Sequence, residues 1–226
     1  MQKIAIENNF SETAFAVKTD KGYDLRWFTP GGEIDLCGHV TLGTAFVIMT
    51  EVEPDCQKID FYTKSGILTV ERDGDLFKMN FPQAEYRKIE VTDEMEKAIG
   101  IRPLEAYLGR DLMMVLPSED DIRNLNPDQS RLKQLPGLIQ SVTARGKEYD
   151  CVSRIFAPKL AVAEDPVTGS THCMIAPYWA EVLGKKIINA NQASKRGGKL
   201  ICRILPDDRI NICGPCILYS KAVLTI

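Results

Sequence analysis

The sequence of 226 residues contains no long apolar run, no run of lysine and arginine, and only two histidines. Its apolar stretches end well short of the roughly 20 residues that cross a membrane. The formal net charge is −3, and no basic patch of the kind that binds nucleic acid stands out. No pattern typical of a secretory signal opens the chain. We therefore expect a cytoplasmic protein that binds neither nucleic acid nor a membrane.

Cysteine is present in an odd number, and the residues are scattered, mostly within apolar segments. Free cysteine behaves there as a small hydrophobic residue. Without an export signal the chain stays in a reducing compartment, where disulfides rarely persist. We therefore expect reduced, buried thiols at Cys37, Cys56, Cys151, Cys173, Cys202, Cys213 and Cys216.

The last two cysteines form the tetrapeptide Cys213-Gly214-Pro215-Cys216, which is of the thioredoxin type. Thiol–disulfide chemistry at such a site needs a helix directly after it, because the helix N-terminus lowers the pKa of the thiol. The segment that follows, ILYSKAVLTI, has the composition of a strand. We therefore interpret the Gly-Pro pair as the tip of a hairpin rather than as part of a redox site.

The most informative feature of the chain is an internal repeat. Residues 26–38 read RWFTPGGEIDLCG, and residues 154–169 read RIFAPKLAVAEDPVTG. Each copy contains Arg-x-Phe-[Thr/Ala]-Pro and then a glutamate with a glycine five residues later, and each leads into an apolar helical run. A second pair of similar segments follows at residues 64–68 and 196–200. The repeat predicts two similar lobes, each with a helix that begins near the motif's glycine.

Outside the two long helices, at residues 39–52 and 170–183, the patterns predict mostly strands. The first helix is apolar on nearly every side, which predicts burial all round. Strands around a buried helix, twice, predict an α+β fold with two barrel-like lobes. Shorter helices are expected at residues 1–8, 93–99, 118–125 and 127–132, and strands at 13–19, 23–28, 59–63, 67–72, 76–81, 106–108, 112–116, 138–144, 149–156, 187–192, 199–204, 210–213 and 217–224.

Both long helices offer a candidate anion site at their N-termini, Gly38 and Gly169. The N–H groups of a first turn have no partner inside the helix and carry part of the dipole's positive charge. Glycine also lets a ligand approach the backbone closely. Simple N-capping is the alternative interpretation of either motif alone.

The differences between the copies indicate where chemistry could reside. His39 aligns with Ser170, Cys37 aligns with Thr168, and Asp165 has no carboxylate counterpart in the first copy. The positive end of the dipole should keep His39 neutral, so that it can hold a polar group or relay a proton. His172, one turn into the second helix, is interpreted as structural or as a support for residues of the site.

A candidate general acid/base precedes the first strand, at Glu12. The next residues are apolar, so we expect the carboxyl group to be partly desolvated and its pKa to be raised. By residue type alone, a solvated glutamate at a strand end is the alternative.

Six segments together resemble the PhzF (phenazine biosynthesis protein) family, which has the diaminopimelate-epimerase-like fold. They are NFSETAF at residues 9–15, RWFTP at 26–30, DLCGHVTL at 35–42, SRIFAP at 153–158, EDPVTGS at 164–170, and residues 192–198. The resemblance runs from residue 1 to near the C-terminus. It implies two similar lobes, each a β-barrel wrapped on a central helix, and a cofactor-independent isomerase, often a homodimer, without a metal.

Carried onto this chain, the family's acid/base glutamate falls on Glu12. The resemblance assigns His39, Asp165 and Ser170 as the other catalytic residues, and Gly38, Gly169 and Thr168 as substrate-binding residues. It implies that Glu12 moves a proton between carbon atoms of a small carboxylate-bearing metabolite in the cleft between the lobes.

One departure from the family concerns the start of the chain, because Met1 stands where the family has an internal Met-Gln. We therefore expect the first lobe to lack its usual N-terminal strand. The expected lobes are residues 1–101, completed by a C-terminal strand at about 216–226, and residues 102–215.

Two other functions are compatible with the same residues. A two-base racemase would use Cys37, although Thr168 stands where its second thiol should be. A binding protein would hold a small acid without turning it over.

Overall fold

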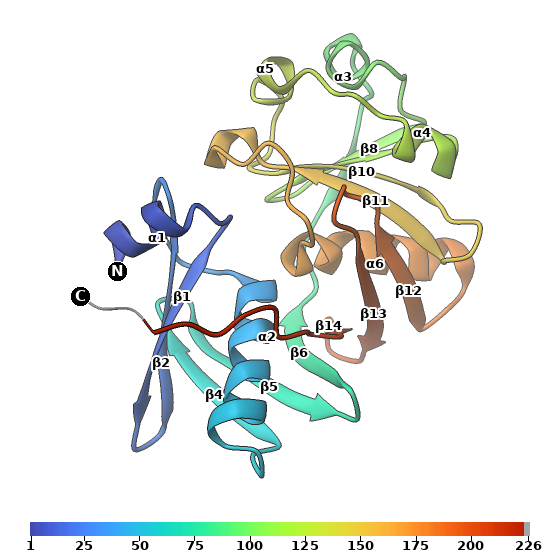
Figure 1. The fold of residues 1–226 in the computed structure, drawn as a ribbon. Helices are drawn as coiled ribbons and strands as arrows, with labels where there is room; N and C mark the ends of the chain where they lie inside the picture. Colours follow the sequence, from blue (N-terminus) through green and yellow to red (C-terminus); the bar gives the residue numbers. More distant parts are fainter. Residues whose placement is uncertain (224–226) are drawn as a thin grey trace. The chain divides into compact units, whose positions relative to one another are not determined.

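The computed structural model describes residues 1–223, and these residues form two compact units (Figure 1). Unit 1 consists of Met1–Met79 and the segment that begins at Cys213, and unit 2 consists of Asn80–Ile212. The first boundary thus lies before residue 101. The reason is that β7 (Arg87–Ile89) pairs with β8 (Glu105–Leu108), and α3 (Asp93–Ile99) contributes buried residues to the core of unit 2.

Unit 1 holds one long helix and a sheet with the strand order β1-β2-β4-β5-β6, in which β3 also pairs with β2. Its elements are α1 (Gln2–Asn8), β1 (Thr13–Thr19), β2 (Gly22–Thr29), β3 (Gly32–Ile34), α2 (Gly38–Val47), a π-helical turn (Ile48–Val52), β4 (Lys58–Thr63), β5 (Gly66–Asp73) and the first part of β6 (Leu76–Pro82).

Unit 2 holds the second long helix, and the order of its strands is β14-β13-β12-β11-β10-β9-β8-β7. Besides β7, β8 and α3, its elements are β9 (Leu112–Val115), α4 (Glu119–Arg123), α5 (Gln129–Leu132), β10 (Gln140–Arg145), β11 (Cys151–Phe156), a 3₁₀ turn (Pro158–Leu160), α6 (Gly169–Leu183), β12 (Ile187–Gln192), β13 (Gly198–Leu205) and β14 (Arg209–Gly214).

The sequence repeat is also a repeat of topology. In unit 1, antiparallel β1 and β2 lead into α2, and the chain returns in β4, parallel to β2. In unit 2, antiparallel β10 and β11 lead into α6, and the chain returns in β12, parallel to β11. A parallel pair needs a crossover, and the helix provides it. Each motif therefore places the start of its helix at the end of a strand.

The arginine and glutamate of the motif form the same ion pair in both units. Arg26 on β2 donates from Nε and Nη2 to Glu33, at 2.8 and 2.9 Å. Arg154 on β11 donates from the same two nitrogens to Glu164, at 2.7 and 2.9 Å. Each guanidinium also lies 5.2 Å from the ring of the motif's phenylalanine. The shared residues thus fasten the strand to the loop that leads into the helix.

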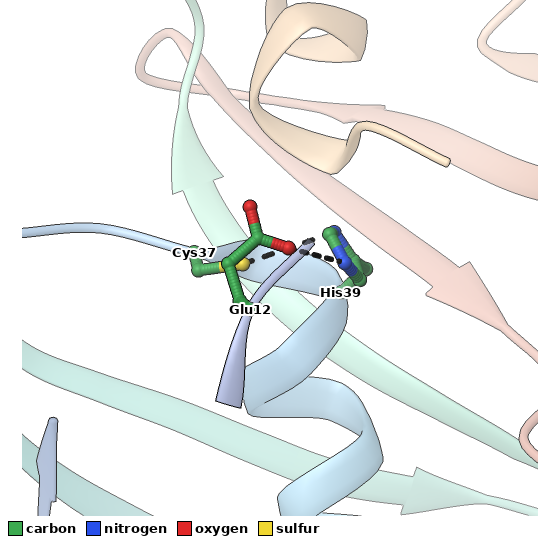
Figure 2. Close-up of side chains that lie close together, drawn as sticks. All are labelled: Glu12, Cys37 and His39. Carbon is green, nitrogen blue, oxygen red and sulfur yellow. Dashed lines mark hydrogen bonds and ion pairs between the residues drawn. The ribbon is translucent and has the colours of Figure 1, made fainter. Parts of the chain in front are cut away.

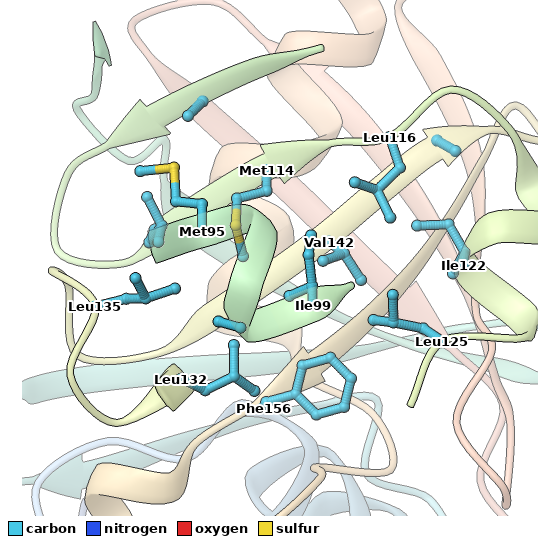
Figure 3. Close-up of a cluster of buried hydrophobic side chains, with 14 of the residues drawn as sticks. Met95, Ile99, Met114, Leu116, Ile122, Leu125, Leu132, Leu135, Val142 and Phe156 are labelled. Carbon is cyan, nitrogen blue, oxygen red and sulfur yellow. The ribbon is translucent and has the colours of Figure 1, made fainter. Parts of the chain in front are cut away.

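One face of β9, β10 and β11 carries the main hydrophobic cluster of unit 2 (Figure 3). Alternate residues such as Leu112 and Met114 point into it, as the two-residue period of a strand requires. From the opposite face, Thr143 accepts a 2.9 Å hydrogen bond from Trp179 of α6. The middle strands are therefore covered on both faces. The cluster consists of Met95, Ala98, Ile99, Ala106, Leu112, Met114, Leu116, Ile122, Leu125, Leu132, Leu135, Val142, Ala144, Val152 and Phe156.

The expectation that the first long helix is buried all round is wrong. In α2 only Gly38, Thr41 and Ala45 are buried, and Val47 is 39% exposed. The helix packs on β1 and β5 with one side, so the apolar residues of its other side keep access to solvent. In α6, by contrast, all residues from Thr171 to Ala176 are buried.

The predicted strand at residues 217–224 is also wrong. The described residues after Gly214 form no strand, and Ile217, Tyr219 and Val223 are 84%, 94% and 94% exposed. Leu224 lies outside the described residues. Because no strand follows β14, the tetrapeptide at residues 213–216 is not the tip of a hairpin. No helix follows it in the described residues either, and burial raises the pKa of Cys216 to about 11, which is the opposite of an activated thiol.

Two expected helix caps are confirmed, and the expectation for the cysteines is confirmed in part. Thr92 and Ser118 cap α3 and α4, accepting hydrogen bonds from the N–H groups of Met95 and Asp121. All seven cysteines are free, and five of them are buried. The expectation of a buried thiol is wrong for Cys56 and Cys216, which are only partly buried. None of the helices within residues 1–223 is both long and apolar enough to cross a membrane.

Candidate functional site

Glu12 and His39 lie side by side at the N-terminus of α2 (Figure 2). His39 is the second residue of the helix, and Glu12 directly precedes β1, which packs against α2. Nε2 of His39 is 3.2 Å from Oε2 of Glu12, and the two side chains are only 21% and 12% exposed. The structure therefore brings together a carboxylate and an imidazole that lie 27 positions apart in the sequence.

Cys37 is the third member of this group. It is the N-cap residue of α2, is buried, and has its Sγ 3.8 Å from Nδ1 of His39. Burial raises the pKa of its thiol, against the opposing influence of His39. The alternative of a two-base racemase requires a thiolate, and this environment disfavours one.

The expected rise in the pKa of Glu12 is wrong. Desolvation by burial does raise it, but the hydrogen bond from His39, the charge of His39 and a hydrogen bond from Ser11 together lower the pKa of Glu12 below its ordinary value. A sequence reading that sees only the apolar residues after Glu12 misses these partners. The carboxyl group is consequently ionised at neutral pH.

The same three side chains have the atom types of a metal site, since one ligand atom from each lies within 4.8 Å of the others. However, Glu12 faces Nε2 of the imidazole, whereas Cys37 faces Nδ1. A single ion could take only one of these nitrogens. The arrangement suits a chain of hydrogen bonds better than coordination of one ion.

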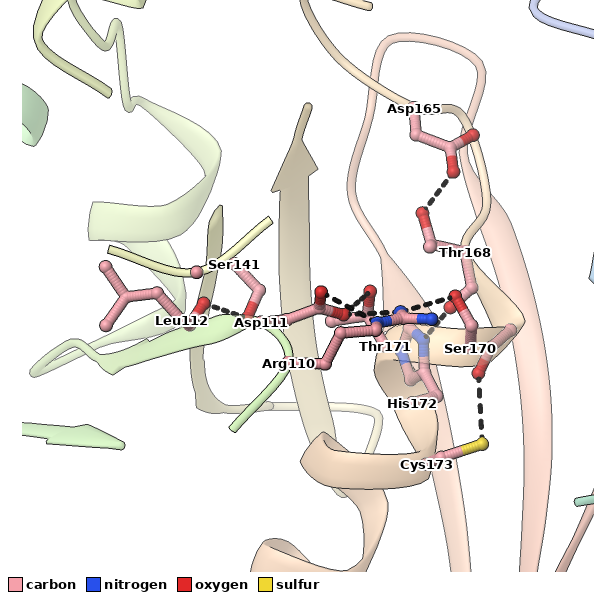
Figure 4. A network of polar contacts seen from close by, with 12 residues as sticks. Arg110, Asp111, Leu112, Ser141, Asp165, Thr168, Ser170, Thr171, His172 and Cys173 are labelled. Atoms are coloured by element: carbon pink, nitrogen blue, oxygen red, sulfur yellow. Dashed lines mark hydrogen bonds and ion pairs between the residues drawn. The ribbon is translucent and has the colours of Figure 1, made fainter. Parts of the chain in front are cut away.

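In unit 2, the loop before α6 is held by hydrogen bonds from a buried glutamine. Gln192 accepts from the N–H of Thr168 at 2.7 Å and donates to the carbonyl oxygen of Asp165 at 2.6 Å. The hydroxyl of Thr168 donates to Oδ2 of Asp165 at 2.5 Å (Figure 4). Asp165 and Thr168, both expected from the sequence, are thus brought together and almost completely buried.

Ser170, in the first turn of α6, contacts an arginine that the sequence analysis did not identify. Arg110 donates from Nη2 to Ser170 Oγ at 3.1 Å and makes a bidentate pair with the buried carboxylate of Asp111 (Figure 4). The hydroxyl of Thr171 also donates to Asp111, at 3.2 Å. The sequence offers one signal for this contact, which is the pair of opposite charges, Arg110 and Asp111, in the turn between β8 and β9.

The two candidate binding glycines occupy the expected positions. Gly38 and Gly169 are the first residues of α2 and α6, and Cys37 and Thr168 are the matching N-caps, so the alignment of the repeats is confirmed residue by residue. Apart from its chain neighbours and the adjacent backbone of α6, no protein atom lies within 4 Å of the place that a Cβ at Gly169 would take. The N-terminus of α6 is therefore not obstructed at this residue by the surrounding protein.

His172 is completely buried, as expected for a structural histidine. Its Nδ1 lies 2.8 Å from the carbonyl oxygen of Thr168, which can only accept, so Nδ1 carries the proton. Nε2 lies 3.3 Å from the hydroxyl of Ser153. Burial lowers the pKa of His172 to about 4, although the hydrogen bond to Thr168 partly opposes this effect.

We expect His172 to make the protein less stable in mild acid. Between pH 6.5 and pH 4 the unfolded chain binds a proton at this residue and the folded protein does not, so the free energy of unfolding falls as the pH is lowered. The expected loss between pH 7.5 and pH 5 is about 2 kcal/mol. Urea denaturation at both pH values measures it.

The matched variant is His172→Asn, which keeps an N–H donor for Thr168 but cannot titrate. This variant should be less stable than the wild-type protein at pH 7.5. Its free energy of unfolding should differ less between pH 7.5 and pH 5. An equal pH difference in both proteins would contradict the assignment, because all other titrating groups are the same.

Comparisons with known proteins agree with this architecture. Residues 1–221 match the family described as phenazine biosynthesis-like protein, PhzC-PhzF. An uncharacterized isomerase of Pseudomonas aeruginosa is 44% identical over 224 residues, which cover 99% of this chain and 86% of that protein. The crystal structure of a PhzF-family phenazine biosynthesis protein from Enterococcus faecalis is 45% identical, with a TM-score of 0.95 over 99% of this chain and 86% of the other.

A predicted epimerase of Pseudomonas aeruginosa shares the fold at lower identity. It is 19% identical, with a TM-score of 0.76 over 100% of this chain and 88% of the other. The α+β, epimerase-like fold class expected from the sequence is therefore confirmed.

Proposed function

This chain belongs to the phenazine biosynthesis-like family, and on that premise we propose that it is a cofactor-independent isomerase of a small carboxylate-bearing metabolite. Glu12 is the acid/base of the proposed reaction: it takes a proton from one carbon atom of the substrate and returns it to another. The Pseudomonas aeruginosa relative is described as an uncharacterized isomerase, which supports the reaction class.

The observation that carries the proposal is the Glu12–His39 pair at the start of α2. Glu12 is ionised before substrate arrives, which is the protonation state that a base requires. Loss of a proton from carbon leaves negative charge on the substrate. The N–H groups of the first turn of α2 and the positive end of its dipole stabilise such charge.

The same proposal assigns supporting roles to the other candidate residues. His39 donates a hydrogen bond to Glu12 and relays protons. Asp165 and Ser170 orient polar groups of the substrate and shuttle protons, and Gly38, Gly169 and Thr168 contact the substrate. It remains a prediction that residues of both units bind the same substrate. It also remains a prediction that the protein is a homodimer.

Deuterium uptake from solvent tests the proposal without knowledge of the natural substrate. The protein is incubated in D₂O with a panel of small cyclic and unsaturated carboxylic acids, and each acid is examined by NMR and mass spectrometry. We expect deuterium at a carbon atom, or a shifted double bond, in at least one acid. Glu94→Gln is the matched control for a Glu12→Gln variant, because Glu94 is an exposed glutamate at the start of α3.

Binding of an acid without deuterium uptake or isomerisation, across the whole panel, would overturn the proposal in favour of a binding protein. Exchange that requires Cys37 but not Glu12 would favour the two-base racemase instead.

A further inference from the structure

The imidazole of His39 has a different neighbour at each ring nitrogen (Figure 2). Nε2 lies 3.2 Å from the carboxylate of Glu12, and Nδ1 lies 3.8 Å from the thiol sulfur of Cys37. The distance to sulfur is longer because sulfur is a larger atom and a weaker hydrogen-bonding partner. The ring is thus contacted along both of its polar edges.

These two contacts determine which ring nitrogen carries the single N–H proton of a neutral imidazole. An ionised carboxylate only accepts hydrogen bonds, so Nε2 must carry the ring proton. Nδ1 then has a free lone pair and accepts, and the thiol of Cys37 is the donor that faces it. We propose that Cys37 is a positioning residue that donates its S–H to Nδ1 of His39 and thereby holds the imidazole in the Nε2–H form that points at Glu12.

The thiol is well suited to this role. Burial raises its pKa, so the sulfur keeps its proton at neutral pH. Its position is also fixed, because Cys37 is the N-cap of α2 and its carbonyl oxygen accepts from the hydroxyl and the N–H of Thr41, at 2.6 and 3.3 Å. The sulfur therefore cannot move away from the ring without disturbing the start of the helix.

The consequence for the proposed function concerns the direction of the hydrogen bond to Glu12. With the proton on Nε2, His39 stabilises the ionised carboxylate. In the other neutral form, a lone pair would face the carboxylate and repel it. The catalytic importance of Cys37 rests on the proposed function of Glu12, whereas the tautomer is a property of the protein without substrate.

The chain offers an unusually clean test, because it contains only two histidines. In protein labelled with ¹⁵N-histidine, two-bond ¹H–¹⁵N correlation spectra show which nitrogen of each ring carries the proton. Near pH 8 we expect Nε2–H for His39 and Nδ1–H for His172, whose Nδ1 faces a carbonyl oxygen. The two rings should therefore give opposite patterns in one spectrum, and His172 serves as the internal reference.

Variants of Cys37 test the positioning role. Cys37→Ala removes the donor, so the His39 signals should broaden or show a second form, and kcat on any acid found by deuterium uptake should fall about tenfold with little change in KM. Cys37→Ser keeps a donor of similar geometry and should restore both the single tautomer and most of kcat. Cys56→Ser is the matched control, because Cys56 lies away from this group, with its sulfur donating to the carbonyl of Lys58.

A proton on Nδ1 of His39 in the wild-type protein would overturn the proposal, as would a Cys37→Ala variant with an unchanged spectrum and unchanged kcat. Failure of the Ser variant to restore kcat would overturn it as well, and would favour thiol chemistry at Cys37. The NMR result needs no substrate, so the isomerase proposal can fail while this one stands.

Discussion

Replacing Glu12 with glutamine should lower the rate of turnover by about 10³-fold, while substrate affinity changes by only a few fold. Glutamine has nearly the same shape and can still contact His39, but its amide cannot accept a proton from carbon. In the wild-type protein the carboxylate is ionised at neutral pH, because burial raises its pKa less than His39 and Ser11 together lower it. The measurement is kcat and KM on the acid identified by deuterium uptake, with affinity from calorimetry.

The control for this prediction is again Glu94→Gln, which removes the same charge from an exposed position. Circular dichroism and thermal unfolding should show that both variants are folded. Turnover within tenfold of the wild-type rate in the Glu12 variant would remove Glu12 from the role of acid/base and leave the proposed function without its base.

Replacing Gln192 with leucine should destabilise the protein by about 3 kcal/mol and also reduce turnover. The side chain of Gln192 is completely buried and satisfies the N–H of Thr168 and the carbonyl oxygen of Asp165. Leucine fills similar space but leaves both groups buried without a partner, and each such loss costs about 1–3 kcal/mol. The loop that carries Asp165 and Thr168 should then shift, which would lower kcat.

Urea denaturation at pH 7.5 measures the loss of stability, and Gln57→Leu is the control. Gln57 is exposed, and its side chain makes one hydrogen bond of 3.5 Å, so its replacement should have little effect. A loss below 1 kcal/mol in the Gln192 variant would show that this glutamine does not hold the loop.

Much of the local structure follows from nearest-neighbour chemistry. Thr92 caps α3 as predicted, because its hydroxyl satisfies an N–H group that the helix itself cannot satisfy. The starts of α2 and α6 coincide with the glycines of the repeated motif. In each of these cases the deciding partners lie within a few residues along the chain.

The errors concern properties that depend on distant parts of the chain. The apolar composition of residues 217–223 suggested a strand, but a strand needs a neighbour to pair with, and no pairing forms there in the described residues. Burial of α2 was overestimated because composition does not reveal that the sheet covers one side of the helix. The pKa of Glu12 was misjudged because its partner His39 lies 27 positions away.

The sequence by itself determined the repeat, the two helix N-termini with their glycines, and the family, because all of these are patterns of residue type and spacing along the chain. Only the tertiary structure decided which side chains meet. It placed Cys37 and Glu12 on opposite nitrogens of His39, and it placed Arg110 beside Ser170. The protonation state of each group follows from these neighbours, since charges and hydrogen bonds act across a few ångströms of space rather than along the sequence.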